Sequence, residues 1–75
     1  SIMDESDVQS LIKNIVTKQL KLDDKKFDAR SVRYQISNAK NLGFSPDQYA
    51  VENPDYRGKV IAEVYQEYQN QLAAN

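Results

Sequence analysis

The sequence predicts an all-α fold, a small bundle of three main helices plus one short helix. Apolar residues recur at steps of three and four along most of the chain, as in amphipathic helices, and no segment alternates apolar and polar residues as a half-buried strand does. Capping and stop residues separate the periodic segments. At 75 residues, the chain is long enough for one small domain, 1–75.

The first predicted helix covers about residues 6–20. Ser6 is the expected N-cap, with Gln9 completing a capping box. The apolar stripe that follows has helical spacing and consists of Val8, Leu11, Ile12, Ile15, Val16 and Leu20. The charged stretch 21–27 connects this helix to the next.

The second predicted helix begins after Asp28, its expected N-cap, and ends near Leu42. Gly43 is expected to stop it, because glycine adopts the left-handed conformation of a C′ residue without strain. One face of this helix is apolar and comprises Ala29, Val32, Ile36 and Ala39.

Ser45-Pro46 predicts a third, short helix, because serine caps helices and proline is tolerated at the first helical position. Asn53-Pro54 repeats this pattern, so the last helix is expected from about Pro54 to Ala73. Its apolar residues again have helical spacing: Val60, Ile61, Val64, Tyr65, Tyr68 and Leu72.

The composition excludes several classes of protein. The chain has no His, Cys or Trp, so it cannot form a disulfide, a Ser-His-Asp or Cys-His catalytic site, or a His/Cys zinc site. No apolar run approaches the ~20 residues of a membrane span. Because 10 basic and 11 acidic residues give a net charge of −1, bulk charge does not favour nucleic acid or membrane.

The charge is nevertheless distributed unevenly. Residues 11–43 carry eight basic and three acidic residues, whereas the segments on either side are acidic. On a helical wheel of the second helix, five polar residues fall within roughly 100° of arc beside the apolar face: Arg30, Arg33, Ser37, Lys40 and Asn41. This sector is either a surface that contacts DNA phosphates, with Ser and Asn as neutral donors, or an ordinary solvated helix face.

Other clusters favour structural roles. Lys21, Lys25 and Lys26 are interrupted by acidic residues, which is typical of a solvated connection. Glu63 and Glu67 have the i,i+4 spacing of an exposed helix face, and nothing indicates the burial that a general acid needs.

The tyrosines divide into two groups. Tyr65 and Tyr68 lie on the apolar stripe of the last helix and are expected in the core. Tyr34 lies away from the apolar sector of its helix and close to Arg30 on the wheel, so it is the one aromatic residue that we keep as a contact candidate.

Several stretches, read together, resemble a known family. They are 36–41 (ISNAKN), 45–49 (SPDQY), 60–69 (VIAEVYQEYQ), 72–75 (LAAN), 2–7 (IMDESD) and 27–30 (FDAR, with Ala29 where the family usually has Pro). In order and spacing they resemble the UvrD/Rep/PcrA family of superfamily 1 DNA helicases over nearly the whole chain.

The resemblance implies subdomain 1B, a helical insertion in the first RecA-like motor domain of an ATP-dependent helicase that moves 3′ to 5′ along DNA. It implies a non-catalytic segment that contacts the duplex or junction backbone, and Lys40 and Asn41 match the family pattern. ATP and Mg²⁺ belong to the parent enzyme outside this segment, so no cofactor is expected here. The implied partners are DNA and the rest of the helicase chain, and we expect a cytoplasmic monomer without membrane contact.

A second class of function stays open. The apolar faces of the first and last helices could instead dock a protein partner, in which case the chain is a non-DNA-binding interaction or structural module. An exposed apolar patch larger than a few hundred Å² would favour this alternative. The absence of His, Cys and a Gly-rich loop disfavours an independent small enzyme.

Overall fold

The computed structural model describes residues 4–74, which form four α-helices, one π-helical turn and no β-strand. In chain order the elements are α1 (Glu5–Asn14), η1 (Ile15–Gln19), α2 (Ala29–Asn41), α3 (Pro46–Glu52) and α4 (Tyr56–Ala74). The all-α prediction is therefore confirmed. Ile2, Met3 and Asn75, which belong to the motifs of the resemblance, lie outside the described residues.

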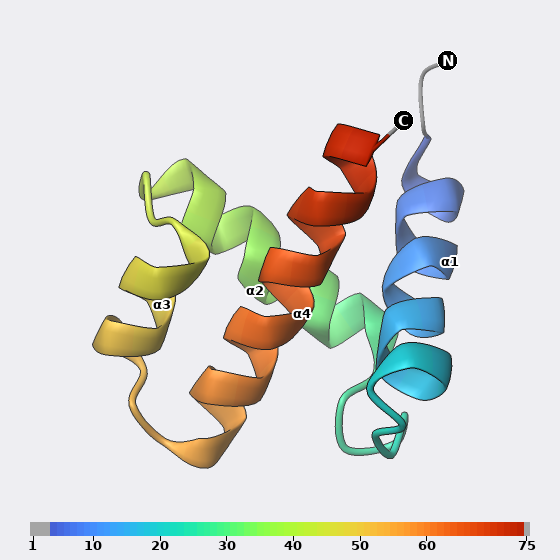
Figure 1. The fold of residues 1–75 in the computed structure, drawn as a ribbon, viewed down its shortest axis with the longest axis horizontal. Helices are drawn as coiled ribbons and strands as arrows, with labels where there is room; N and C mark the ends of the chain where they lie inside the picture. The colour runs from blue at the N-terminus through green and yellow to red at the C-terminus, as the bar shows by residue number, and fades with distance from the viewer. Residues whose placement is uncertain (1–3, 75) are drawn as a thin grey trace.

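The four helices surround one core. α4 crosses in front of α2, and α1 and α3 lie on opposite sides of α4 (Figure 1). The chain therefore enters along α1 on one side, passes behind α4 in α2, and returns through α3. α2 is the element that contributes both to this core and to the rear surface of the molecule.

α1 begins earlier than predicted, and the predicted cap at Ser6 is wrong. Asp4 is the N-cap, because the Asp7 backbone N–H donates to the Asp4 carboxylate at 2.9 Å and the Asp4 backbone N–H donates back to Asp7 at 3.4 Å. Asp is as good an N-cap as Ser, and its negative charge also favours the positive end of the helix dipole. The capping box is thus formed by Asp4 and Asp7 and not by Ser6 and Gln9.

The first helix does not remain α-helical to residue 20. It widens into the π-helical turn η1, in which the Leu20 backbone N–H donates to the Ile15 carbonyl at 2.9 Å. Ile15, Val16 and Thr17 are consecutive β-branched residues, which crowd the preceding turn of an α-helix. The Thr17 hydroxyl also donates to the Lys13 carbonyl at 2.8 Å, a contact that bends helices. Ile15 and Val16 stay fully buried, so the wider turn keeps the apolar stripe on the core.

The boundaries of α2 and the start of α3 are confirmed. The Asp28 carboxylate accepts a hydrogen bond from the Ser31 backbone N–H at 3.1 Å, and Gly43 follows the helix with a φ of +77°. The Ser45 hydroxyl oxygen accepts from the Gln48 backbone N–H at 3.1 Å, with Pro46 in the first turn. Each of these cap and stop signals acts within one helical turn.

The predicted start of α4 at Pro54 is wrong by two residues. Asp55 is the residue that caps α4, since its carboxylate accepts from the Gly58 backbone N–H at 3.0 Å. Asn53 instead ends α3, where its side-chain amide donates to the Tyr49 carbonyl at 3.1 Å. Gly58 allows α4 to begin so close to α3, because a Cβ at this position would overlap the Asn53 carbonyl oxygen.

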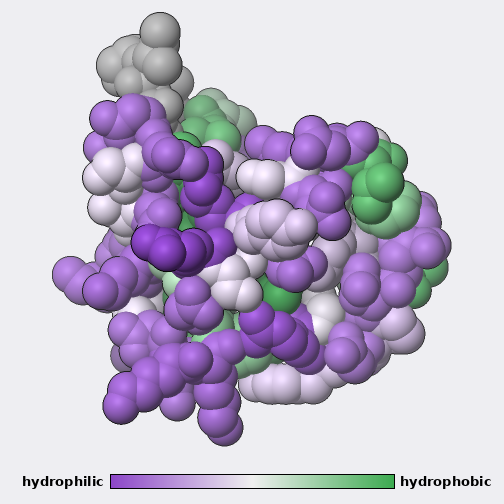
Figure 2. All heavy atoms as spheres, turned by 180° about the vertical axis from the view of Figure 1, so that it is seen from behind, coloured by the Kyte–Doolittle hydropathy of each residue, from purple (hydrophilic) through white to green (hydrophobic). Residues whose placement is uncertain are grey.

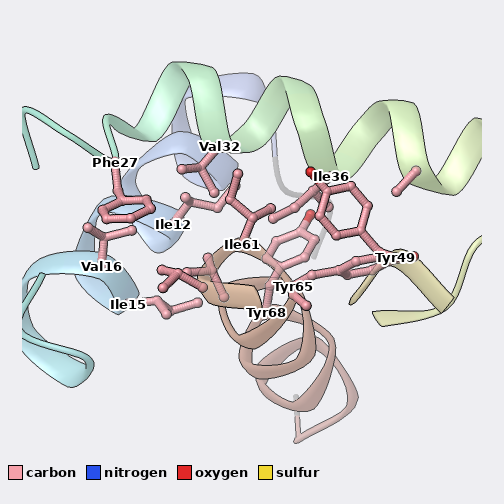
Figure 3. Packing of buried hydrophobic residues seen from close by; sticks show 14 residues of the cluster. Ile12, Ile15, Val16, Phe27, Val32, Ile36, Tyr49, Ile61, Tyr65 and Tyr68 are labelled. Carbon is pink, nitrogen blue, oxygen red and sulfur yellow. The ribbon is translucent and has the colours of Figure 1, made fainter. Parts of the chain in front are cut away.

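The core lies where α2 crosses α4, with α1 and η1 on one side and α3 on the other (Figure 3). The stripes expected from the sequence point into it from α1, α2 and α4, including Ile12, Val32, Ile36 and Ile61, and Tyr49 of α3, which was not predicted, joins them. The apolar faces of α1 and α4 therefore pack inward and are not open to a partner.

Tyr65 and Tyr68 are buried, as predicted. The Tyr65 hydroxyl donates to the Phe44 carbonyl at 2.7 Å, and burial raises the pKa of Tyr65 above its ordinary value. This hydrogen bond ties the connection that follows α2 to the middle of α4.

Candidate nucleic-acid interface

α2 carries all five residues of the predicted phosphate-contacting sector. Asp28 and Gly43 fix the two ends of this helix. From Arg30 to Asn41 the helix rises about 16 Å, which matches about five phosphate steps of one DNA strand. The side of the molecule behind α4, where α2 lies, is largely hydrophilic (Figure 2).

Two of the five side chains contact side chains of neighbouring helices. The Arg33 guanidinium lies 2.9 Å from the Glu5 carboxylate of α1, with 29% of the Arg33 side chain and 76% of the Glu5 side chain exposed. The Lys40 ammonium lies 5.2 Å from the centre of the Tyr68 ring on α4. An exposed ion pair contributes only about 0–1 kcal/mol, so a phosphate can compete with Glu5 for Arg33.

The other three form what we call the outer edge of α2: Arg30, Ser37 and Asn41. All three are exposed, and within residues 4–74 none has a hydrogen-bond, ion-pair or ring partner. The five residues thus divide into two groups. Arg33 and Lys40 contact side chains of neighbouring helices, whereas the side chains of the outer edge are free to bind a ligand.

Arg57, which was not among the predicted site residues, brings a further cation to the start of α2. Its guanidinium donates to the Lys26 carbonyl at 2.6 Å and to the Ser31 hydroxyl at 3.3 Å, and lies 5.2 Å from the centre of the Phe27 ring. In the chain, Lys26 precedes Arg57 by 31 positions and Ser31 precedes it by 26 positions. No local sequence pattern could therefore have revealed these contacts. Arg57 fixes the 21–27 connection against α4 and extends the basic surface beyond α2.

Other types of site find no support in the described part of the chain. No group of three or more acidic side chains between residues 4 and 74 is placed to hold a metal ion. Over the same residues, no helix combines the length and apolar character needed to cross a bilayer.

A comparison with known protein families shows which family the chain is related to. The family model described as the UvrD/REP helicase N-terminal domain matches residues 1–75, the whole chain. The chain belongs to the UvrD/Rep helicase family. The resemblance seen in the order and spacing of the motifs is therefore confirmed.

Individual members of the UvrD/Rep family agree with this assignment. The chain is 41% identical to the ATP-dependent DNA helicase PcrA of Bacillus subtilis (strain 168), 39% to that of Staphylococcus aureus (strain Mu50) and 36% to that of Staphylococcus epidermidis. Each match covers 100% of this chain but 10% of the relative. The chain thus spans about a tenth of the length of these curated relatives. No solved structure matches the chain at a significant level.

Proposed function

We propose that this chain is the DNA-proximal helical subdomain, of the 1B type, of an ATP-dependent DNA helicase that moves 3′ to 5′. In this proposal the outer edge of α2 contacts the backbone of the duplex or of the junction between single and double strands. The observation that carries the proposal is the free, exposed guanidinium of Arg30, with two neutral donors further along the same side of α2, in a chain of this helicase family.

The chemistry of the outer edge suits phosphate. A guanidinium donates two parallel hydrogen bonds to phosphate oxygens, and Ser37 and Asn41 add neutral donors further along the same helix. Contacts of this kind position a protein on DNA without reading its sequence. We therefore expect binding that is independent of base sequence.

The distribution of charge also favours approach from the side of α2. α2 carries three basic and no acidic residues, whereas α3 and α4 together carry two basic residues and four acidic ones, a net charge of −2 that repels phosphate: Asp47, Glu52, Glu63 and Glu67. Within this proposal the chain orients DNA, while ATP and Mg²⁺ are bound by other parts of the longer helicase. Its role is accordingly positional and not catalytic.

Binding of a fluorescent forked DNA at about 20 and 200 mM salt tests the proposal. Affinity should fall steeply with salt, and Arg30→Gln should weaken binding to all sequences and reduce the slope of log affinity against log salt by about 1. Lys59→Gln is the matched control, because it removes the same charge beside Asp47 and Glu63 in the groove between α3 and α4. Salt-independent binding, or equal effects of the two variants, would contradict the proposal.

The helicase context is tested separately in the longer protein. With ATP present, it should separate a duplex that has a 3′ single-stranded tail and leave a duplex with a 5′ tail intact. Arg30→Gln should slow strand separation more than ATP hydrolysis, since the proposed contact is to DNA and not to nucleotide. Equal loss of both activities would argue against a purely positional role.

A further inference from the structure

Tyr34 is a large aromatic side chain that α2 leaves in solvent. It is 65% exposed, and among residues 4–74 it has no hydrogen-bond or ring partner. Tyr49, Tyr65 and Tyr68 are buried, and Tyr56, although exposed, packs edge-on against Phe27 with ring centres 6.3 Å apart. Tyr34 therefore contributes neither to the core nor to a ring contact.

The surroundings of Tyr34 are polar. The positions three and four residues away on its helix, which share its face, are Arg30, Ser31, Ser37 and Asn38. On the wheel Tyr34 lies about 40° from Arg30 and about 20° from Asn41, so it borders the outer edge. A lone ring among hydrogen-bond donors does not suit an apolar protein partner, whose binding needs a continuous apolar patch.

A ring beside a guanidinium does suit a ligand that has both a flat aromatic surface and a negative charge. A nucleotide has both, because its base stacks on aromatic side chains and its phosphate binds cations. Arg30 and Tyr34 lie one helical turn apart, about 6 Å along the axis. Inside a closed duplex the faces of the bases are covered by their neighbours, so away from the duplex ends only an unpaired base can stack on a protein ring.

We propose that Tyr34 stacks on an unpaired base at the junction while Arg30 binds a neighbouring phosphate, so that this face distinguishes a fork or single strand from closed duplex. This inference rests on the proposed function, because it requires that the outer edge of α2 meets DNA. It adds a specificity-determining residue to an otherwise electrostatic surface.

Binding of Tyr34 variants to a fork, a single strand and a blunt duplex tests the inference. Tyr34→Leu should weaken binding to the fork and the single strand about 5-fold or more and leave duplex binding within about 2-fold, because one stacked base is lost. Tyr34→Phe keeps the ring and should bind like the unchanged protein. Tyr56→Leu is the matched control, an equally exposed tyrosine on α4, and should not alter the preference for unpaired DNA. Circular dichroism checks that each variant is folded.

The outcomes separate the two proposals. If Arg30→Gln weakens all three substrates while Tyr34→Leu affects none, or affects duplex equally, stacking is wrong and the proposed function stands. If Tyr34→Phe is as weak as Tyr34→Leu, the hydroxyl and not the ring makes the contact, and stacking is again wrong. If the unchanged chain binds none of the three DNAs, both proposals fail.

Discussion

The inward and outward faces of α2 carry different kinds of side chain under different constraints. Val32, Ile36 and Ala39 face inward and are at most 2% exposed, so their shape is fixed by the packing around them. The side chains of Arg30 and Tyr34 face outward and make no hydrogen bond, ion pair or ring contact within residues 4–74. One face of this 13-residue helix thus packs in the core, and the opposite face is exposed to solvent. Substitutions on the inward face should therefore change stability, and substitutions on the outward face should change DNA binding.

The largest effect is expected inside. Ile36→Ala removes buried methyl groups and leaves a cavity, and should lower the free energy of unfolding by about 2–5 kcal/mol. For a domain of this size that is a large share of the total stability. Urea denaturation followed by circular dichroism measures it. The control on the outward face is Ser37→Ala, whose free energy of unfolding should stay within about 0.5 kcal/mol of that of the unchanged protein. Equal losses of stability in the two variants would show that the two faces do not differ in this way.

The cap that positions both faces should matter next. Asp28→Ala leaves the Ser31 backbone N–H without its acceptor and should cost about 0.5–2 kcal/mol. Asp28→Asn keeps an acceptor oxygen, so its melting temperature should lie between those of the unchanged protein and the alanine variant. A melting temperature unaffected by Asp28→Ala would mean that tertiary packing alone holds the start of α2.

The hydrogen bond from Tyr65 to Phe44 anchors the chain after α2, and Tyr65→Phe should cost about 0.5–1.5 kcal/mol at neutral pH.

Burial raises the pKa of both Tyr65 and Tyr49, so the folded state retains phenolic protons that the unfolded chain releases above about pH 10. Stability is therefore complete below that pH and falls as pH rises through the raised values. Between pH 9 and about 11, the urea midpoint should fall less steeply for Tyr65→Phe than for the unchanged protein. An identical fall in the two proteins would show that Tyr65 does not contribute to the loss of stability at high pH.

The smallest effect on stability is expected at the contact between α1 and α2. Glu5→Gln removes an exposed ion pair and should change the free energy of unfolding by less than about 0.5 kcal/mol. It also frees Arg33 and removes a negative charge, so affinity for forked DNA at low salt should rise about 2-fold. Anisotropy titrations measure this rise, and weaker binding of Glu5→Gln would show that the pair positions Arg33 for DNA instead of competing with it.

Several helix ends that are set by signals within one turn were predicted correctly from sequence. The caps at Asp28 and Ser45 and the stop at Gly43 are of this kind. The start of α1 was misassigned because two pairs with the same three-residue spacing compete there, and Asp4 with Asp7 forms the box. The π-helical turn escaped prediction because the apolar spacing of residues 12–20 fits an α-helix equally well.

The candidate site was predictable only as a sector of one helix. The wheel predicted one sector that includes Arg30 and Arg33, but it could not show that Arg33 meets Glu5, which is 28 positions earlier in the chain. The position of Lys40 over the Tyr68 ring is likewise a contact between helices. Tertiary contacts therefore divide a surface that the sequence presents as uniform.

Mapping of backbone amide shifts by NMR during titration with forked DNA tests the central claim most directly. We expect the largest shifts at the outer edge of α2 (Arg30, Ser37 and Asn41) and at Tyr34, which borders it, and we expect them to shrink as salt is raised. Shifts concentrated on the acidic side chains of α3 and α4, or the absence of any shift on α2, would contradict the account.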